Sequence, residues 1–220
     1  MTVAASSILH ALRTSNGAPV LLHGISWQTY ETLLREIGEQ HIFLTYDRGD
    51  LEIIAPSNFH ERYKKIVARL IEILTLELNI PIVSGGNTTF RREDLEKGLE
   101  PDECYYVQHE PQMRDKWEVD LLQDPPPDLV LEMDYTHHAL DRESIYAALG
   151  VPELWRCKGN RLEVLLLGTN GAYQLSTKSR AFPFLPMDQI ERFMLLSTST
   201  PETRLMRSFR DWVKQNLGVS

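Results

Sequence analysis

Apolar residues recur at helical spacing in two stretches of the N-terminal part of the chain. After Ser26, whose side chain suits a helix cap, they return every three or four positions until Gly38 interrupts the pattern. A longer apolar stripe runs through residues 58–79 and stops before Pro81, a residue that cannot continue a helix. The pattern predicts a short amphipathic helix after Ser26 and a long helix over 58–79.

Short apolar runs bounded by turn residues predict strands. The runs at 42–46 and 51–54 flank "DRGD", where glycine can adopt the positive φ that a tight turn needs, so they predict a β-hairpin. The segment "REDLEKGLEPDE" and a later Pro-rich stretch are polar and predict loops. Further strands are expected at 82–84, 88–91, 104–109 and 128–134.

The C-terminal part of the chain predicts a helix, three strands and two more helices. Asp141 can cap a helix that continues through Leu149, and Gly150 is a typical helix stop. The runs "ELWRCK", "RLEVLLL" and "AYQLST" predict strands, the first two of them joined at a "GN" turn. The last helices are expected near 187–197 and 201–216.

The order of these elements predicts the α/β or α+β class, with a mixed β-sheet flanked by helices. An N-terminal helix and β-hairpin precede the sheet, and a C-terminal helical extension is expected over 185–217. A chain of 220 residues, 42% of them hydrophobic, is long enough for one sizeable core. We therefore expect residues 1–220 to form a single domain.

Composition narrows the functional classes. The chain has 23 basic and 31 acidic residues, and its net charge of -8 argues against a protein that coats nucleic acid non-specifically. A small basic cleft is compatible with that charge. Cys104 and Cys157 stand in apolar surroundings without metal-ligand spacing, and we expect buried, reduced thiols. The sequence shows no signal-peptide pattern and no apolar run of membrane-spanning length, so we expect a cytoplasmic protein without membrane contact.

Carboxylates interrupt the strand expected at 128–134. Because strand side chains alternate, Asp128, Glu132 and Asp134 share one face, and we expect them to gather opposite the apolar face that packs on the core. Asp128 and Asp134 lie at the ends of the strand and have ordinary structural explanations. Glu132 lies within the strand, where a carboxylate needs a partner. A hard divalent cation such as Mg²⁺ or Mn²⁺ is a natural partner, because it prefers oxygen ligands.

A second acidic position stands at the start of the strand expected at 104–109. In "GLEPDECYYVQH", Asp102 follows Pro101, and we expect this strand to pair with 128–134. Asp102 and Glu132 can then converge on one metal ion. Phosphodiester hydrolysis needs such a site, because a metal binds the phosphate, lowers the pKa of an attacking water and offsets charge on the leaving oxygen.

Asp102 after a proline, followed by Glu132 within an apolar strand, resembles the PD-(D/E)xK nuclease motif. More specifically, "GDLEIIAPSNFH", "EPDECYYV", "PDLVLEMD" and "IYAALGVPELWR", in this order, resemble the Uma-two family of restriction-endonuclease-like proteins. The resemblance covers about residues 26–170. It implies a Mg²⁺- or Mn²⁺-dependent endonuclease acting on DNA, with Asp102 and Glu132 as metal ligands.

The resemblance also implies a restriction-endonuclease-like core over 26–170, in which a helix, three strands, a second helix and a further strand follow one another. The first core helix corresponds to 58–79, and the second corresponds to 141–149. The metal strands correspond to 102–109 and 128–134. This order agrees with the elements that the hydrophobic pattern predicts.

One position departs from the motif. Asp134 stands two residues after Glu132, where the motif has a lysine. In this family a lysine typically comes instead from the following helix, four residues before the tyrosine that corresponds to Tyr146, and here that position is Arg142. Arginine stays protonated and cannot act as a base, but its planar fork can hold a phosphate or offset developing charge. Either the metal suffices with Arg142 as an electrostatic aid, or activity is much reduced.

Four further residues are candidates by position. His60 and Glu61 stand at the start of the first core helix, which in this fold can lend a polar or acidic group to the metal site. We include His60 among the catalytic candidates. His137 and His138 follow the second metal strand and can line the cleft, although their spacing matches no other ligands and favours a solvent-facing loop.

Basic and aromatic residues give only weak indications of nucleic-acid binding. Trp155, Tyr105 and Tyr106 stand in apolar strands, and we expect core packing instead of base stacking. The best candidates for DNA contact are Arg62, Lys64, Lys65, Arg69, Arg91 and Arg92, although a charged helix flank is usually a solvated face.

Two other functional classes fit the same residues. The acidic net charge and Arg142 favour a nuclease-fold protein that has lost efficient chemistry and serves as a binding or assembly module, with a homodimer as one form. An unrelated metal-dependent hydrolase of a small phosphoester would use the same carboxylates. It would need a closed pocket instead of an open basic groove.

Overall fold

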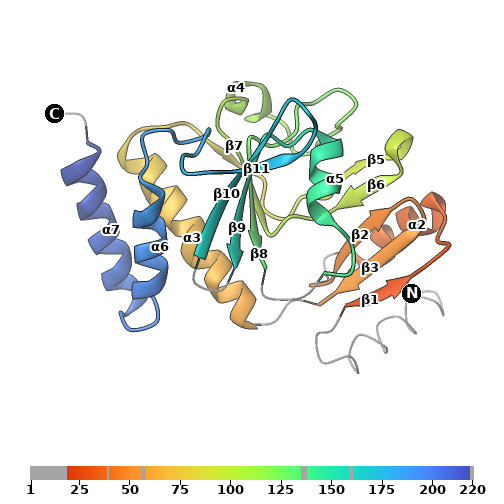
Figure 1. Cartoon of the computed structure of the whole chain (residues 1–220), viewed down its shortest axis with the longest axis horizontal. Helices are drawn as coiled ribbons and strands as arrows, with labels where there is room; N and C mark the ends of the chain where they lie inside the picture. The colour runs from red at the N-terminus through yellow and green to blue at the C-terminus, as the bar shows by residue number, and fades with distance from the viewer. Residues whose placement is uncertain (1–18, 39, 56–57, 135–137, 159–160, 219–220) are drawn as a thin grey trace.

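The computed structural model consists of two β-sheets with helices around them (Figure 1). The class is α+β, as predicted, with the restriction-endonuclease-like order of elements. No helix in the described part of the chain combines the length and the apolar composition that crossing a membrane requires. The structure describes residues 19–38, 40–55, 58–134, 138–158 and 161–218, with the backbone alone at 58–60.

The first sheet, here called the N-terminal sheet, lies at the right of Figure 1. Its strands are β1 (Val20–Leu22), β2 (Phe43–Asp47), β3 (Asp50–Ile54), β5 (Phe90–Arg92) and β6 (Lys97–Leu99). They are ordered β1-β3-β2-β6-β5, and neighbouring strands are antiparallel. Helix α2 (Trp27–Ile37) packs its apolar face onto this sheet and forms a small separate core with it.

The second sheet, here called the central sheet, is larger. Its strands are β4 (Val83–Ser84), β7 (Glu103–Tyr106), β8 (Leu129–Met133), β9 (Glu153–Lys158), β10 (Arg161–Leu167) and β11 (Tyr173–Ser176). They are ordered β11-β10-β9-β8-β7-β4. The β8–β9 pairing is parallel and the other described pairings are antiparallel, so the sheet is mixed, as predicted.

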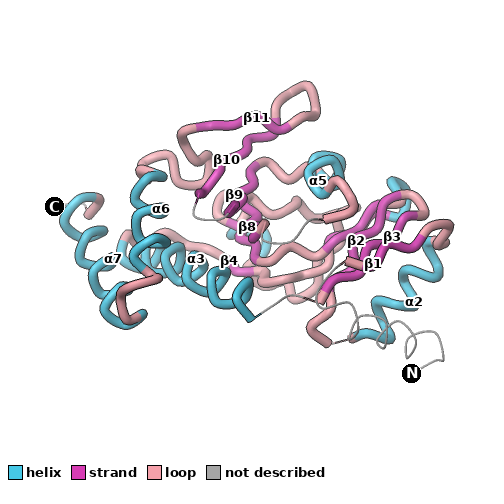
Figure 2. The backbone as a smooth tube through the Cα atoms, turned by 60° about the horizontal axis from the view of Figure 1, so that its bottom comes forward, coloured by secondary structure: helices cyan, strands magenta, loops and turns pink. Residues whose placement is uncertain are grey.

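Helices cover both faces of the central sheet. On one side lie α3 (Asn58–Glu77), α6 (Met187–Leu196) and α7 (Glu202–Asn216), which share the largest core with the sheet. On the other side α5 (Arg142–Leu149) stands between the central sheet and the N-terminal sheet, in a second core that includes residues from both (Figures 1 and 2). Helix α5 therefore links the two sheets.

Local signals account for the ends of α2 and α5. The Ser26 side chain accepts a hydrogen bond from the Thr29 backbone N–H at the start of α2, and Gly38 follows the helix with a φ of 53°. The Asp141 side chain accepts from the Ser144 N–H at the start of α5, and Gly150 ends that helix at a φ of 82°. These helices, the long helix α3, the hairpin β2–β3 and the strands β9, β10 and β11 confirm the predictions made for them.

Two predicted loops contain structure. The segment "REDLEKGLEPDE" holds a 3₁₀ turn (Glu93–Leu95) and the strand β6, and the Pro-rich connection before β8 holds the short helix α4 (Glu110–Met113). Periodicity missed β6 because "KGL" is short and largely polar. It is held by its neighbours instead, since Gly98 pairs with Tyr46 of β2 and a Cβ there would meet the Tyr30 hydroxyl at 2.4 Å.

The apolar face of β8 packs on the core, as expected, and the face that carries Glu132 is covered as well. Leu129, Leu131 and Met133 pack on the α3 side as expected. The opposite face is also buried, because Val130 belongs to the core around α5 and Glu132 is 9% exposed. Any charge on that face therefore lies inside the protein. The single domain over 1–220, with its extension over 185–217, stays a prediction.

Candidate active site between the two sheets

Asp102 and Glu132 come together at neighbouring strands, as predicted. Strands β7 and β8 pair antiparallel with Glu103 opposite Leu131, so the preceding Asp102 stands across from Glu132. Asp102 Oδ2 accepts a 2.6 Å hydrogen bond from the backbone N–H of Met133, the residue after Glu132. Both carboxylates are buried. Two acidic groups thus meet inside the protein, and their charges need compensation.

Arg142 supplies part of that compensation. Its Nη2 lies 2.6 Å from Glu132 Oε1, and the Tyr146 hydroxyl donates to the same carboxylate oxygen. Arg142 and Tyr146 are one turn apart on α5, so they reach the carboxylate together. The guanidinium also lies 5.7 Å from the centre of the Tyr146 ring. The residue that stands in the place of the family's lysine therefore forms a buried ion pair with Glu132.

The other hydrogen bonds of Arg142 fix its position between the sheets. Nη1 donates to Thr45 Oγ1 of β2 at 2.6 Å, and Nη2 donates to the backbone carbonyl of Glu100 at 2.7 Å. The Arg142 side chain is 9% exposed, and Thr45 is buried as well. The N-terminal sheet thus supplies one of the groups that orient the guanidinium.

Burial and charge shift the protonation of this cluster. Burial raises the pKa of Glu132, and nearby Asp102 adds to the rise, while Arg142 opposes it without cancelling it. Burial also raises the pKa of Tyr146 well above its ordinary value, and Glu132 adds to that rise. The charge of Glu132 raises the pKa of Arg142 despite burial, so the arginine stays a cation. The site holds one permanent positive charge beside two carboxyl groups.

A third buried carboxylate, Glu52 of β3, reaches the same region. It is 1% exposed, and its Oε1 lies 2.8 Å from Nδ1 of His138. The backbone N–H groups of Ala139 and Leu140 donate to Oε2. Burial alone would raise the pKa of Glu52, but the hydrogen bond and charge of His138, together with these N–H groups, lower it. Glu52 therefore holds the segment that leads into α5 and Arg142.

A pocket opens beside these residues, with a volume of about 260 Å³. Strand β8, the segment before α5, α5 itself and strands β9 and β10 all contribute side chains to it. Glu132 and Arg142 line it together with His138, so the ion pair and the histidine face one space. The full lining consists of Glu132, Asp134, His138, Leu140, Asp141, Arg142, Glu143, Tyr146, Leu154, Arg156 and Leu165.

Of the other two carboxylates of the β8 segment, Asp134 lines the same pocket as Glu132 and Asp128 does not. Asp128 lies at the opposite end of the strand, where it accepts hydrogen bonds from the backbone of Val107 and from the ring and backbone of His109. It ties down the turn after β7 and has the structural role considered for it. Asp134 lines the pocket and interacts electrostatically with Arg156.

The candidates on the first core helix are placed elsewhere or lie outside the described side chains. His60 lies in the first turn of α3, and its side chain is outside the described residues. Glu61 forms ion pairs with Lys64 at 2.9 Å and with His41 at 3.5 Å. His137 also lies outside the described residues. His138 does line the pocket, and it is paired with Glu52 instead of pointing from a solvent-facing loop.

The basic residues proposed for DNA contact are divided between α3 and β5, and the described lining of the pocket includes none of them. Arg62 and Arg69 pair with Glu202 of α7, and Lys64 pairs with Glu61. The remaining three are Lys65, which is exposed on α3, Arg91, which pairs with Glu31, and Arg92, which pairs with Asp94.

The predictions for aromatic residues and thiols are confirmed. Trp155 is fully buried and packs edge-on against Phe182, and Tyr105 and Tyr106 are buried as well. Cys104 and Cys157 are buried free cysteines, and burial raises the pKa of each thiol. These groups belong to the cores and not to the pocket.

Asp102 and Glu132 offer the kind of donor that a hard divalent cation prefers. The two carboxylates are oxygen donors, and Mg²⁺ often takes one or two carboxylates together with water and substrate phosphate. Within the described residues, no group of three or more histidine, cysteine, aspartate or glutamate side chains is placed to hold a metal. The residues therefore fit a two-carboxylate site and not a closed cage of protein ligands.

Sequence reasoning missed Thr45 and Glu52 as parts of this site. Thr45 and Arg142 are 97 residues apart in the chain, and Glu52 and His138 are 86 residues apart. No local sequence pattern therefore joins either pair. Glu52 nevertheless carries the signal that identified Glu132, since it is a carboxylate between Leu51 and Ile53 in an apolar strand. That signal could have found it.

Comparison with protein-family models gives a match over most of the chain. The Uma2 model, described as "Putative restriction endonuclease", matches residues 27–193. Comparison with curated proteins found none that matches. The matched segment contains Asp102, Glu132 and Arg142 and both sheets except β1. It covers well over half of the chain, and the protein therefore belongs to the Uma2 family.

Proposed function

We propose that the protein is a Mg²⁺- or Mn²⁺-dependent endonuclease that hydrolyses DNA phosphodiester bonds, with Asp102 and Glu132 as the metal ligands. The observation that carries the proposal is the meeting of these two buried carboxylates at β7 and β8. Membership of a family described as restriction endonucleases supports DNA as the substrate.

The metal, when bound, would stabilise charge on the phosphate and make water a better nucleophile. Arg142 has a different task. As a permanent cation it offsets the charge of Glu132, and its fork can hold a phosphate oxygen, but it cannot accept a proton. Thr45 and the Glu100 carbonyl keep the guanidinium in place, and its burial excludes water that would weaken its field.

Cleavage of supercoiled plasmid with Mn²⁺ or Mg²⁺ tests the proposal. Asp102→Asn and Glu132→Gln remove each charge but keep an oxygen that can accept the hydrogen bonds seen at Met133 and Arg142. We expect each to lower the cleavage rate by about 100-fold or more, because the metal's contribution is several kcal/mol. Asp115→Asn, an exposed aspartate away from the pocket, is the matched control and should cleave like wild type.

Binding of Mn²⁺ measured by calorimetry gives a readout independent of cleavage. Wild type and Asp115→Asn should bind the ion, and Asp102→Asn and Glu132→Gln should bind it weakly. The proposal fails if wild-type protein at high concentration with Mn²⁺ leaves supercoiled, linear and single-stranded DNA intact.

The ion pair of Arg142 favours a second candidate function. In that function the protein has the nuclease fold without efficient chemistry and serves as a binding or assembly module, with a homodimer as one form. The guanidinium already neutralises Glu132, which weakens the attraction of that carboxylate for a metal. Arg142→Lys separates the two functions. Faster cleavage would identify a working site that arginine slows, whereas unchanged inactivity together with no Mn²⁺ binding would support the module.

A further inference from the structure

We propose that His138 accepts the proton of the attacking water and that Glu52 is the positioning residue that orients it. The inference rests on the proposed nuclease function and deepens it, since it names the group that handles the proton where Arg142 stands instead of lysine. It concerns residues of the segment before α5 and of the N-terminal sheet.

The geometry of the His138–Glu52 pair selects one ring nitrogen. Glu52 is acceptor-only when ionised, so the 2.8 Å contact requires Nδ1 of His138 to carry a proton and donate it. Nε2 then has a lone pair and can receive a proton. A carboxylate that fixes the tautomer and steadies the cation formed later is the arrangement that makes histidine an effective base.

The carboxylate is itself held in place. Glu52 is 1% exposed, and the N–H groups of Ala139 and Leu140 donate to its second oxygen, so it does not depend on His138 for its position. His138 differs, because 22% of its side chain is exposed. The ring therefore has a fixed partner and a partly exposed side chain, and proton transfer from water needs both.

The other titratable groups of the pocket have competing tasks. Arg142 cannot accept a proton, and the Tyr146 hydroxyl donates to Glu132. Asp141 caps α5, and Glu143 pairs with Arg156, whose charge also attracts Asp134. Histidine is also the side chain whose ordinary pKa lies nearest to neutrality. Among the described lining, His138 is therefore best suited to cycle a proton.

The charges around His138 come from four elements. Glu52 of β3 lies against the ring, and Glu132 of β8 interacts with it electrostatically. The same pocket is lined by charged residues after β8, at the start of α5 and on β9, namely Asp134, Asp141, Arg142, Glu143 and Arg156. The two nearest of these by contact or electrostatic interaction are carboxylates. They can offset the charge of the imidazolium that forms when Nε2 takes up the water proton.

The chemical step balances with water as the second reactant. The water proton passes to Nε2 of His138 while the water oxygen forms a bond to phosphorus. The bond from phosphorus to the leaving oxygen breaks, and that oxygen keeps the electron pair and takes a proton from solvent. The imidazolium then returns its proton to solvent. The products are a phosphate monoester and an alcohol, with no oxidant or reductant involved.

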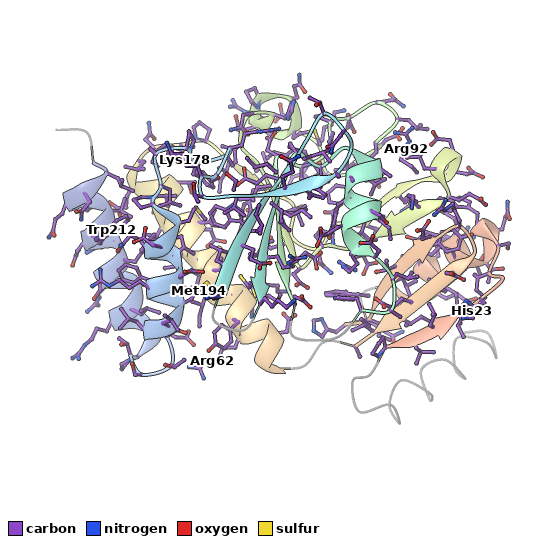
Figure 3. All side chains as sticks on the ribbon, in the orientation of Figure 1. His23, Arg62, Arg92, Lys178, Met194 and Trp212 are labelled. Atoms are coloured by element: carbon purple, nitrogen blue, oxygen red, sulfur yellow. The ribbon has the colours of Figure 1, made fainter. Side chains whose placement is uncertain are left out.

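His138→Asn tests the role of the base, because asparagine can still donate to Glu52 but cannot accept a proton at the position of Nε2. We expect kcat for plasmid cleavage to fall by about 100-fold or more, with the acid limb of the pH profile lost. His23→Asn is the matched control. His23 also contacts a carboxylate, Asp50, at 2.7 Å, but it is exposed on the N-terminal sheet and does not line the pocket (Figure 3).

Glu52→Gln tests the positioning role. The amide oxygen can still accept from Nδ1, but the negative charge is gone, so we expect a loss of about 10-fold in kcat and a shift of the acid limb to lower pH. A merely structural role would leave the pH profile in place. NMR of the His138 ring should show Nδ1 protonated and Nε2 unprotonated in neutral wild-type protein, as the contact with Glu52 requires.

The outcomes separate this inference from the function on which it rests. Cleavage by His138→Asn at the wild-type rate, with Asp102→Asn inactive, would overturn the role of His138 and leave the nuclease proposal standing. Protonation of Nε2 in place of Nδ1 would overturn it too. No cleavage by wild-type protein under any metal condition would overturn both proposals.

Discussion

The two faces of strand β8 are buried equally well but are stabilised by different forces. On the α3 side, Leu129, Leu131 and Met133 contact other apolar side chains of the largest core. On the α5 side, Glu132 takes part in an ion pair and a hydrogen bond that continue to Thr45 of the other sheet. The first face gains its stability from area removed from water, and the second gains it only while its charges remain paired.

This difference bears on the site proposed for the chemistry. The apolar face tolerates many side chains of similar volume, because its contacts are non-directional. The polar face depends on particular atoms, and each of its charges is costly without its partner. A protein keeps such a cluster at a cost in stability when chemistry needs it. Substitutions on the α5 face should therefore have coupled effects on stability.

Arg142→Met breaks the polar face most severely. It leaves Glu132 buried without its cation, and we expect a loss of about 4 kcal/mol in the free energy of unfolding. Urea denaturation at neutral pH measures the change. The double variant Glu132→Gln with Arg142→Met removes both charges and should recover most of the loss. If the double variant is no more stable than Arg142→Met, the two residues do not act as a pair.

Leu131→Ala tests the apolar face. A fully buried leucine replaced by alanine costs about 3 kcal/mol through lost burial and the cavity left behind. The same denaturation experiment measures it. Adding Leu131→Ala to Arg142→Met should give a nearly additive loss, because the side chains lie on opposite faces of the strand. Strong non-additivity would mean that the two faces are one cooperative unit and not two.

The sequence predicted the apolar face more fully than the polar one. Periodicity located α2 and α3 because a single helix carries the whole signal, and capping residues such as Ser26 and Asp141 marked its ends. Asp102 and Glu132 were found because a carboxylate in or beside an apolar strand is costly. The partners of Arg142 and His138 come from the N-terminal sheet, and only the folded chain brings these segments together.

The short elements also depend on partners from distant parts of the chain, which limits their prediction from sequence. Strand β6 has three residues and is held by pairing on both sides, with Gly98 fitted against Tyr30. Alternation in a strand gives the direction of each side chain but not what covers it, so the sequence of β8 did not indicate that the face of Glu132 is buried. Here α5 covers it, and nothing within β8 indicates that helix.

Glu52→Gln tests whether the stability of the polar face depends on pH. The folded protein lowers the pKa of Glu52, so its contribution to stability is present above the ordinary carboxyl pKa and is lost as pH falls through the lowered value. We expect Glu52→Gln to cost about 2 kcal/mol at pH 7, because it weakens hydrogen bonds to a charged group. The difference from wild type should narrow below about pH 4. A difference that stays constant down to the acid transition would contradict the assignment of this pH dependence to Glu52.

The smallest expected effect separates stability from function by comparing two helix caps. Ser26 caps α2 and Asp141 caps α5 through equivalent hydrogen bonds of 3.2 and 3.3 Å, so Ser26→Ala and Asp141→Ala should each cost about 1 kcal/mol in thermal or urea unfolding. Only the second cap precedes Arg142 directly and lines the pocket. Asp141→Ala should therefore slow cleavage several-fold, whereas Ser26→Ala leaves the rate unchanged. Equal rates in the two variants would mean that the start of α5 is stabilised by Glu52 and the ion pair alone, and that the cap plays no part in holding Arg142.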